Sequence, residues 1–395
     1  MSLRIGFLIS HPIQYYAPIF RELAGLCDLT VFFAHRQTAE QQGQAGFGVA
    51  FDWDIDLLSG YRSKFLENIS RQPSADRFLG CDTPGIAREI AEGGFDAFVV
   101  PGWGFRSYMQ AAKACRQAGV PIFVRGDSQL IGPRNLLLRL AKAIAFSRLL
   151  RRFDGFLYVG QRSREYLLYY GVPANRLFFS PHCVDNASFR AASDSARRSM
   201  SGAPRRNKRL LFVGKLLERK RPLDVLRAAA LLREKLPVEV AFAGSGELES
   251  ELREFARASG VPAVFHGFVN QSEMPAVYAA ADVIVLPSDG LETWGLAVNE
   301  AMACGLPAVV SDAVGCGPDL VEPGVTGAVF PVGQVSQLAA AMEAAISLDL
   351  TVMRQHLAAR MQVYSPLGAA KGIMQGAAVL AAEAPPKGEK RQPHA

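Results

Sequence analysis

The sequence predicts an α/β protein with two domains, each built on a mainly parallel sheet that has helices on both faces. Its 395 residues exceed what one hydrophobic core usually supports, so two domains of ordinary size are expected. Short β-rich apolar runs alternate with helical patterns in both halves of the chain, and this alternation is typical of parallel sheets. A stretch without an apolar period, residues 190–209, interrupts the alternation near the middle of the chain.

Six apolar runs in the first half are predicted as buried strands. They are Arg4–Ser10, Leu29–Ala34, Phe95–Pro101, Pro121–Arg125, Phe153–Val159 and Arg176–Ser180. Helical patterns lie between several of them, at Tyr15–Leu26, Gly104–Gly119 and Asn135–Arg152. The interruption at 190–209 is rich in Ala, Ser and Arg and contains seven basic residues, and we interpret it as an interdomain linker.

The alternation is cleaner in the second half. Its predicted strands are Leu210–Val213, Val238–Ala243, Val264–His266, Val283–Leu286, Ala308–Ser311 and Gly327–Phe330, with helices near 222–236, 247–259, 272–280, 295–304 and 334–347. The predicted domains are therefore 1–189 and 210–364, joined by the linker 190–209 and followed by a C-terminal helix at 365–383 and a disordered tail at 384–395. Open parallel sheets bind ligands at the carboxyl ends of their strands, so we expect the two domains to face each other across a cleft.

Composition limits the class of protein. The chain is 49% hydrophobic and 20% charged, as in a globular protein, and its net charge of +6 does not by itself suggest nucleic acid as a partner. No run of about 18 uninterrupted apolar residues is present, and the start lacks the features of a signal peptide, so we expect a cytoplasmic location. The six cysteines are scattered singly, which does not fit a disulfide framework or a zinc site.

The densest motif runs from Glu292 to Asp312 and follows a predicted strand. Glu292 falls in the loop after that strand, and a helix is expected to begin near Gly295. Glu300 then lies roughly 7–8 Å further along the helix axis. The free amides and the positive dipole end of the helix suit a diphosphate between the two carboxylates. One carboxylate can reach a sugar on one side of that diphosphate, and the other can reach a ribose on the other side.

These residues resemble the family 4 retaining glycosyltransferases, which have the GT-B fold of two Rossmann-like domains. The resemblance rests on the two glutamates spaced eight residues apart, the Trp-Gly-Leu between them and the following Ala-Met-Ala-Cys-Gly-Leu-Pro. Four further segments agree with the family in the same order: Phe212–Lys220, Ala243–Glu247, His266–Val269 and Ser311–Val321. The resemblance is close over about residues 210–332.

The resemblance implies a metal-independent retaining enzyme. It would move a hexose-type sugar from a UDP- or GDP-sugar to a glycan or lipid-linked acceptor in surface polysaccharide or glycolipid synthesis, with no cofactor besides the nucleotide sugar and no metal. By the same resemblance Lys215 and Lys220 hold the donor diphosphate, Glu300 holds the ribose hydroxyls, and Glu292 contacts the transferred sugar. The remaining implied donor contacts, several of them through backbone amides, are Gly214, Gly244, Gly246, Phe268, Val269, Thr293, Trp294, Gly295 and Leu296.

The first half resembles the family less closely. Ser10–Tyr16 is similar to a His-Pro-Ile-Gln variant found among bacterial members, which makes His11 a candidate catalytic residue, with a helix-capping role as its alternative. Arg125–Ser128 ends a strand where other members often carry a His-Asp pair. Asp127 or Ser128 takes that place here, and we select Asp127 as the catalytic candidate.

Two other segments are candidates for the acceptor pocket and for the domain junction. Gly102–Gly104 could line the acceptor pocket or serve packing. Pro181–Asp185 resembles the family's segment at the domain junction, where we expect His182 to be structural.

Asp52-Trp-Asp-Ile-Asp56 contains the D-x-D pattern with which metal-dependent glycosyltransferases bind Mn²⁺. It precedes no phosphate-binding helix, and alternating acids on a short extended segment suit a solvated edge. We therefore predict no metal site there.

The segment from Ser128 to Phe153 has no acidic residue. Its six basic residues are Arg134, Arg139, Lys142, Arg148, Arg151 and Arg152. On a helical wheel Leu136, Leu140, Ala143, Ile144 and Leu150 share one face. Residues 134–152 could thus bind an anionic membrane on its inner face or form a packing helix with a solvated basic side, and we favour the membrane slightly.

Two alternative functions stay open. A nucleotide-sugar epimerase of the GT-B fold would use the carboxylates for proton transfer. A non-catalytic GT-B subunit would bind a partner glycosyltransferase. Intact Glu292, Glu300, Lys215 and Lys220 favour an active enzyme over the silent subunit.

Overall fold

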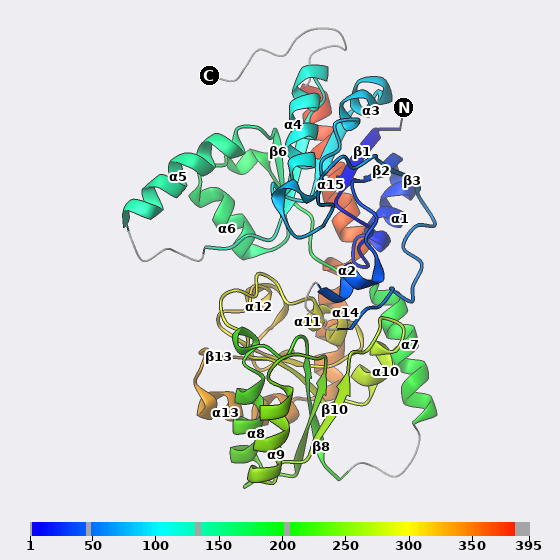
Figure 1. Cartoon of the computed structure of the whole chain (residues 1–395). Helices are drawn as coiled ribbons and strands as arrows, with labels where there is room; N and C mark the ends of the chain where they lie inside the picture. Colours follow the sequence, from blue (N-terminus) through cyan, green and yellow to red (C-terminus); the bar gives the residue numbers. More distant parts are fainter. Residues whose placement is uncertain (1, 45–48, 131–135, 201–205, 384–395) are drawn as a thin grey trace. The chain divides into compact units, whose positions relative to one another are not determined.

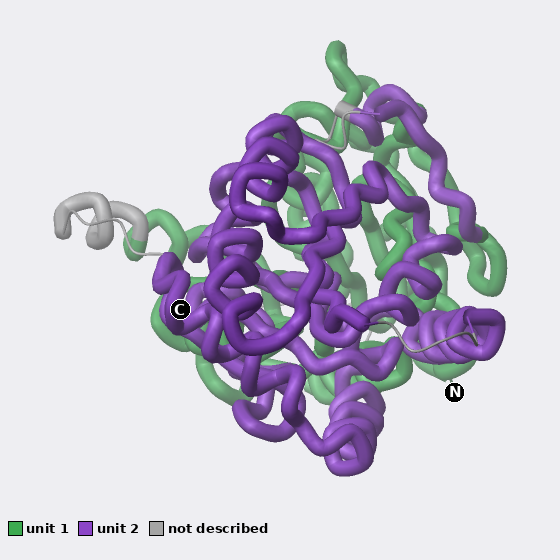
Figure 2. The backbone as a smooth tube through the Cα atoms, turned by 90° about the horizontal axis from the view of Figure 1, so that it is seen from below, with its two compact units in different colours: residues 1–38, 56–182, 366–395 green, residues 39–55, 183–365 purple. Residues whose placement is uncertain are grey.

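The computed structural model describes residues 2–44, 49–130, 136–200 and 206–383 (Figure 1). The chain forms two compact units (Figure 2). Unit 1 consists of Met1–Thr38, Asp56–His182 and Pro366–Ala395, and unit 2 of Ala39–Ile55 and Cys183–Ser365. This differs from the single boundary near 190 that the sequence predicts, because residues 39–55 group with unit 2. The predicted tail at 384–395 lies outside the described residues.

Unit 1 contains a seven-stranded parallel sheet in the order β3-β2-β1-β4-β5-β6-β7. Its strands are β1 (Arg4–Ile9), β2 (Asp28–Phe33), β3 (Arg62–Phe65), β4 (Ala97–Val100), β5 (Ile122–Gly126), β6 (Gly155–Tyr158) and β7 (Leu177–Phe179). All except β3 were predicted. The sequence of β3, Arg-Ser-Lys-Phe, carries no apolar run because it lies at the sheet edge with its charged residues exposed.

The helices of unit 1 are α1 (Ala17–Leu26), α3 (Ile86–Gly93), α4 (Arg106–Ala118), α5 (Leu136–Leu150), α6 (Gln161–Tyr169) and α15 (Pro366–Glu383), with short 3₁₀ turns η1 (Phe78–Gly80) and η2 (Ala174–Arg176). The predicted C-terminal helix is α15, which packs along α1 and β7 (Figure 1). A Cβ atom at Gly372 would lie 1.7 Å from the carbonyl oxygen of Phe179, so only glycine allows α15 to approach β7 this closely.

Unit 2 contains a six-stranded parallel sheet in the order β10-β9-β8-β11-β12-β13. Its strands are β8 (Lys208–Val213), β9 (Val238–Ala243), β10 (Ala263–Gly267), β11 (Val283–Leu286), β12 (Ala308–Ser311) and β13 (Gly327–Phe330), close to the predicted ranges. The order reverses at β8, which lies between β9 and β11, as it does at β1 in unit 1. Such reversal points are where open parallel sheets bind ligands, outside the carboxyl ends of the strands.

The helices of unit 2 are α2 (Ala39–Gln44), α7 (Asn186–Ser199), α8 (Pro222–Leu232), α9 (Glu249–Ser259), α10 (Met274–Ala279), α11 (Leu296–Ala303), α12 (Gly317–Leu320), α13 (Val335–Ile346) and α14 (Leu350–Val363), with the 3₁₀ turn η3 (Glu218–Lys220). Apolar side chains of α8 and α13 pack on the sheet and form the core of the unit.

The linker prediction is wrong over residues 190–199, which belong to α7. Asp185 caps this helix by accepting a hydrogen bond from the amide of Ser188 at 3.0 Å. The helix packs against α10 and α11, but only Phe189 and Ser193 are buried on it, so its inward face leaves no apolar period in the sequence. Arg197 adds a hydrogen bond to the carbonyl oxygen of Cys304. Residues 201–205 of the predicted linker lie outside the described part of the chain.

The predicted basic helix corresponds to α5 and can be compared with the structure from residue 143 onward. Ile144, which the helical wheel places on the apolar face, is 54% exposed, whereas Leu150 is buried. The side chains of Arg148, Arg151 and Arg152 are exposed. Within the described residues no single helix is long and apolar enough to cross a membrane, and only the bent pair Val335–Ile346 with Leu350–Glu383 meets that length and composition criterion.

Candidate functional site

Two glycine-rich loops meet at the carboxyl ends of β8 and β9 in unit 2. The amide of Leu216 donates to the carbonyl oxygen of Ser245 at 2.9 Å, which ties the loops together. A Cβ atom at Gly244 would lie 2.1 Å from the carbonyl oxygen of Gly214, and one at Gly246 would lie 2.5 Å from that of Leu216. Gly214 and Gly244 also have φ angles of +142° and +137°. These glycines are therefore required for the loops to approach each other.

The loop after β8 carries the two predicted phosphate-binding lysines. The ammonium group of Lys220 contacts the carboxylate of Glu292, and each of these side chains is 14% exposed. The hydroxyl of Ser288 donates to the same carboxylate at 3.3 Å. Burial, with Arg219 and Lys215 nearby, lowers the pKa of Lys220 to about 8. Burial and Arg219 also lower the pKa of Lys215. Three cationic side chains are thus held close together, which favours an anionic ligand.

The loop that carries Glu292 is held by a second loop that follows β12. The amide of Gly315 donates to the carbonyl oxygen of Glu292 at 2.9 Å, and the amide of Cys316 donates to that of Trp294 at 2.9 Å. A Cβ atom at Gly315 would lie 1.8 Å from the carbonyl oxygen of Thr293. The backbone of this region is therefore fixed by close contact before any ligand is present.

Trp294 contributes to the structure of this loop through its side chain. The indole is 5% exposed, and its Nε1 donates to the side-chain oxygen of Asn299 at 2.7 Å. Its ring centre lies 6.1 Å from that of Tyr364. Any ligand contact at this position is left to the backbone. Gly295 follows with a φ of +105° and begins α11, whose first residue is Leu296. The first amides of α11 point out of the helix end, as expected for an anion-binding terminus.

Glu300 is held by two hydrogen-bond donors that sequence reasoning did not identify. The hydroxyl of Tyr278 donates to one carboxylate oxygen at 2.7 Å, and the amide of Gln271 reaches the other at 3.5 Å. Burial raises the pKa of Glu300, and these two hydrogen bonds oppose that shift. Nothing in the sequence links Gln271 or Tyr278 to Glu300, because they lie 29 and 22 residues away in the chain and reach it only through the fold.

Phe268 and Val269 follow β10, the edge strand of the sheet, and both are half-buried. The ring of Phe51 lies 4.4 Å from the ring of Phe268, centre to centre. The amide of Gly244 donates to the carbonyl oxygen of Gly267 at 2.7 Å. The predicted base-flanking segment thus lies beside the glycine loop, with an aromatic side chain from residues 39–55 against it.

Two of the three aspartates of the D-x-D segment, Asp54 and Asp56, cap turns. Asp54 accepts hydrogen bonds from the hydroxyl of Ser272 and, at 3.1 Å, from its amide. Asp56 accepts from the amides of Leu58 and Ser59 at 2.9 and 3.1 Å. No strand forms here, and all three aspartates are exposed, which agrees with the solvated position expected from the sequence. Among the described residues no group of three His, Cys, Asp or Glu side chains is suited to hold a metal ion.

His11 follows β1 at the reversal point of the unit 1 sheet. Its Nδ1 lies 3.0 Å from the hydroxyl of Ser10, and the buried amide of Ser10 donates to the hydroxyl of Tyr108 at 2.9 Å. Burial and His35 lower the pKa of His11 to about 4. The imidazole is therefore neutral near pH 7.

The strand end that carries Asp127 is anchored by a buried arginine. Arg125 is 1% exposed, and its guanidinium donates three hydrogen bonds. The acceptors are the hydroxyl of Ser180 at 3.1 Å, the carbonyl oxygen of Pro181 at 2.7 Å and the hydroxyl of Tyr16 at 3.0 Å. This ties β5 to the segment after β7 and to the start of α1. Asp127 itself is placed at the carboxyl edge of the sheet.

The structure brings His182 next to Asp127, with 3.8 Å between Nε2 and the nearer carboxylate oxygen. His182 is 7% exposed, the ring of Tyr15 lies 5.7 Å from it edge-on, and burial lowers its pKa. A neutral imidazole thus lies beside a carboxylate at His182, for which the sequence predicts a structural role.

Trp103, of the predicted Gly102–Gly104 segment, packs edge-on against Phe146, with 5.5 Å between the ring centres.

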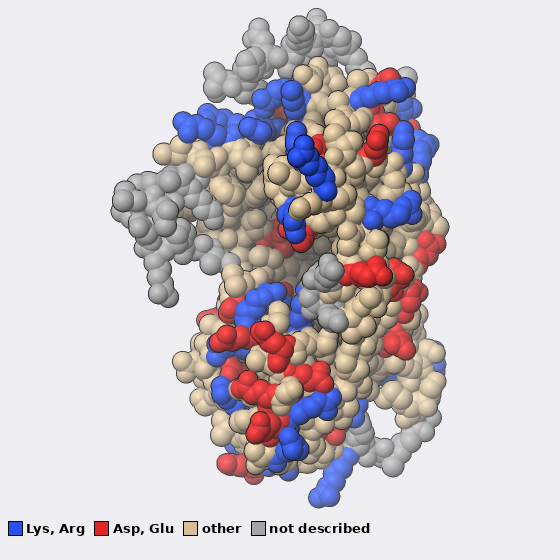
Figure 3. Space-filling view, viewed as in Figure 1, with Lys and Arg blue, Asp and Glu red and all other residues tan. Residues whose placement is uncertain are grey.

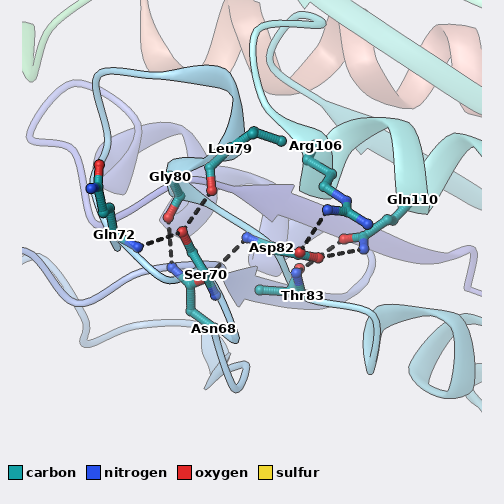
Figure 4. A network of polar contacts seen from close by, with 9 residues as sticks. All are labelled: Asn68, Ser70, Gln72, Leu79, Gly80, Asp82, Thr83, Arg106 and Gln110. Carbon is teal, nitrogen blue, oxygen red and sulfur yellow. Dashed lines mark hydrogen bonds and ion pairs between the residues drawn. The ribbon is translucent and has the colours of Figure 1, made fainter.

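The loop after β3 is held by a network of polar contacts (Figure 4). Asp82 pairs with Arg106 at 3.1 Å and accepts from the amide of Gln110 at 2.7 Å, while Asn68 accepts from the amide of Asp82 at 2.9 Å. Three apolar side chains on this loop are nevertheless exposed: Ile69 (54%), Phe78 (48%) and Leu79 (58%). Sequence reasoning gave this loop no role.

Comparison with known proteins gives matches mainly to unit 2. Residues 194–362 match the family model of the glycosyl transferases group 1. A sulfoquinovosyl transferase of Arabidopsis thaliana is 36% identical over 168 residues, which are 41% of this chain and 31% of that protein. A D-inositol 3-phosphate glycosyltransferase of Mycobacterium tuberculosis is 33% identical over 190 residues, 46% of this chain and 38% of that protein. The matches thus span about a third of the length of these relatives, 31% and 38%.

Solved structures match the chain over nearly its whole length. An Anabaena protein, HepE, in complex with UDP and glucose has a TM-score of 0.67 at 18% identity, covering 94% of this chain and 98% of that one. Sucrose-phosphate synthase of Thermosynechococcus elongatus has a TM-score of 0.65 at 17% identity, covering 97% and 100%. At these identities the likeness concerns the fold, which is GT-B. The chain thus has the GT-B fold, and its residues 194–362 match the family model of the glycosyl transferases group 1.

Proposed function

We propose that this protein is a metal-independent, retaining glycosyltransferase of family 4. It transfers a hexose-type sugar from a nucleoside-diphosphate sugar to a glycan or lipid-linked acceptor in surface polysaccharide or glycolipid synthesis. The observation that carries the proposal is the Lys220–Glu292 ion pair at the reversal point of the unit 2 sheet, beside Lys215 and the start of α11.

The arrangement suits the departure of a nucleoside diphosphate. The leaving group gains negative charge in the transition state, and preorganised cations and helix amides stabilise such charge where water is excluded. Lys220 and Lys215 supply the cations, and the first turn of α11 supplies amides. Burial is the largest cause of the lowered pKa of both lysines, and Arg219 lowers both further. The negative charge of a bound diphosphate opposes these effects.

The two glutamates are assigned different parts of the donor. Glu300, held by Tyr278 and Gln271, binds the ribose hydroxyls. Glu292 binds the transferred sugar once a phosphate has taken its place at Lys220. Phe268 and Val269 flank the base. HepE, which shares the fold, was solved with UDP and with UDP-glucose, and this supports a UDP-sugar as the first donor to test, with GDP-sugars second.

Unit 1 holds the acceptor in this proposal. His11 and Asp127 lie at the carboxyl edge of its sheet, and the neutral imidazole of His11 can accept a hydrogen bond from an acceptor hydroxyl. The carboxylate of Asp127 can likewise accept a hydrogen bond, so each group is suited to orienting an acceptor hydroxyl.

We also propose that the protein works in the cytoplasm as a peripheral protein on the inner face of the membrane. Ile144 is exposed near Arg148, Arg151 and Arg152, and no acidic residue interrupts residues 128–153. Figure 3 shows Lys and Arg side chains gathered on this side of unit 1. An apolar side chain among cations is the chemistry that binds anionic lipid headgroups.

The test of the donor assignment compares Glu300→Gln with Glu292→Gln by calorimetry and turnover. Glu300→Gln should weaken free UDP by about 1.5–3 kcal/mol, because a charge-assisted hydrogen bond is lost. Glu292→Gln should not weaken UDP, because the phosphate displaces Glu292 from Lys220. It should lower turnover instead, because the sugar contact matters most as charge develops. Equal losses of UDP affinity would overturn the split of roles.

Incubation of the donor without an acceptor distinguishes the two alternative functions. An epimerase would yield a changed nucleotide sugar under these conditions. A silent subunit would bind no donor and would not be affected by either substitution.

A further inference from the structure

We propose that two buried tyrosines, Tyr278 and Tyr364, are positioning residues that set the two halves of the donor site separately. Tyr278 fixes Glu300 and thereby sets nucleotide affinity. Tyr364 fixes the loop that carries Glu292 and thereby sets turnover. The inference rests on the proposed function, since it takes the roles of the two glutamates from there.

Tyr278 acts directly on Glu300. It lies on α10, is fully buried, and donates its hydroxyl to Glu300 at 2.7 Å. The second carboxylate oxygen has the longer contact with the side-chain amide of Gln271, at 3.5 Å. The tyrosine hydroxyl is therefore the stronger of the two restraints on the carboxylate. Burial already raises the pKa of Glu300. Removal of the Tyr278 hydroxyl would take away the shorter of the two hydrogen bonds that oppose this shift.

Tyr364 acts on the Glu292 loop through Asp319. Tyr364 follows α14 and is 6% exposed, and its hydroxyl donates to the carboxylate of Asp319 at 2.8 Å. Asp319, on the short helix α12, is 2% exposed. Arg360 from α14 donates to the carbonyl oxygen of the same residue at 3.0 Å. Helix α12 is thus fixed to α14 by buried polar contacts.

The connection continues from α12 to Glu292 through the backbone. The amide of Asp319 donates to the carbonyl oxygen of Cys316 at 3.0 Å, and the amide of Cys316 donates to that of Trp294 at 2.9 Å. The preceding amide, of Gly315, donates to Glu292 at 2.9 Å. A second, direct connection is the contact between the rings of Trp294 and Tyr364, whose centres lie 6.1 Å apart. A change at the Tyr364 hydroxyl is therefore transmitted to the loop of Glu292 through a series of hydrogen bonds of 2.8 to 3.0 Å.

The end of α14 is itself held in place. Asn186 at the start of α7 donates its side-chain amide to the carbonyl oxygens of Met361 and Tyr364, at 2.7 and 2.9 Å. Tyr364 thus has a fixed backbone, a fixed hydroxyl and a ring against Trp294. These contacts hold Tyr364 in one position, from which it restrains the loop of Glu292.

The experiment compares Tyr278→Phe with Tyr364→Phe, which remove one hydroxyl each and keep the ring. The control is Tyr169→Phe on α6, whose side chain is 50% exposed. Tyr278→Phe should weaken free UDP about tenfold and leave turnover at saturating donor within about twofold. Tyr364→Phe should lower turnover about tenfold and leave UDP affinity within about twofold. Tyr169→Phe should change neither.

A double variant separates positioning from loss of folding. Once Glu300→Gln has removed the charge, adding Tyr278→Phe should cost little further UDP affinity, because contacting residues that act together are non-additive. Thermal unfolding of each variant without ligand reports general destabilisation. The inference is overturned if both tyrosine variants change the same constant, if neither changes any, or if the double variant is additive. Wild-type protein that binds neither UDP nor GDP would instead overturn the proposed function.

Discussion

Lys220 and Glu292 form an ion pair across the reversal point of the unit 2 sheet, one from the loop after β8 and the other from the loop after β11. Each side chain is 14% exposed, so each would leave an uncompensated charge if the other were removed. In the proposed function a donor phosphate replaces Glu292 at Lys220. The freed carboxylate then becomes available to the sugar of the same donor.

The pKa of Lys220 predicts how nucleotide affinity depends on pH. This pKa is lowered to about 8, and a bound diphosphate raises it again, so the complex holds a proton that the free protein has lost above that pH. Affinity for UDP should therefore be highest below pH 8 and should fall by up to about tenfold per pH unit above it. Calorimetry between about pH 6.5 and 9.5 measures this dependence.

Substitution with arginine provides the control for this assignment. Lys220→Arg keeps its charge throughout this range and should flatten the fall in affinity. Lys215→Arg, which makes the same change at the neighbouring lysine, should leave most of the fall in place. A fall that disappears only in Lys215→Arg would assign the titration to Lys215.

Activity should not require a divalent metal. The diphosphate charge is met by Lys215, Lys220 and the amides at the start of α11, so transfer or donor hydrolysis should proceed fully in excess EDTA. Loss of activity on chelation, with recovery on adding Mn²⁺, would contradict this. Asp52 and Asp54 would then be the first residues to substitute.

Gly315 should be more sensitive to a methyl group than Gly290 in the same region. In Gly315→Ala the new Cβ would lie 1.8 Å from the carbonyl oxygen of Thr293, so the loop that carries Glu292 must move. A misplacement of about 1 Å can cost about a hundredfold in rate, and we expect a loss of turnover of that order. Gly290→Ala is the matched control, because nothing lies within 4 Å of its new Cβ. Steady-state kinetics of both variants check the contrast, which fails if Gly315→Ala retains wild-type turnover.

The sequence predicts the central parallel strands well because strands such as β4, β11 and β12 are buried on both faces and therefore form uninterrupted apolar runs. It also predicts the turns at Gly214, Gly244 and Gly295, since each has a positive φ that glycine adopts without strain. The edge strand β3 and helix α7 were missed because their buried faces are too small to produce a periodic pattern.

The partners of the site residues could not be predicted from local pattern. Tyr278 reaches Glu300 from another helix, and Tyr364 reaches Asp319 from 45 residues away. Residues 39–55 join unit 2 through contacts such as the amide of Asn270 to the carbonyl oxygen of Asp52 at 2.8 Å, which no periodicity records. Such contacts depend on how the elements pack, and the sequence pattern describes only the elements.

The last prediction concerns the basic part of α5. Reversing Arg148, Arg151 and Arg152 to glutamate should abolish sedimentation with liposomes that contain anionic lipid, because each cation near such a surface contributes about 1 kcal/mol. Activity on a soluble acceptor analogue should be retained, since none of the three residues belongs to the proposed donor or acceptor site. The attraction is electrostatic and should weaken as salt shortens the screening length.

A matched reversal of three exposed arginines in unit 2, Arg233, Arg253 and Arg257, tests whether position or only net charge matters. That variant has the same change in total charge and should still sediment. Ile144→Ser, which keeps every charge and removes the exposed apolar side chain, should weaken sedimentation to a smaller extent than the triple reversal, because burying that one side chain contributes less than three cations do. If the wild type does not sediment with anionic liposomes at low salt, or if both triple reversals lose binding equally, the basic side of α5 is a solvated surface and the membrane assignment is wrong.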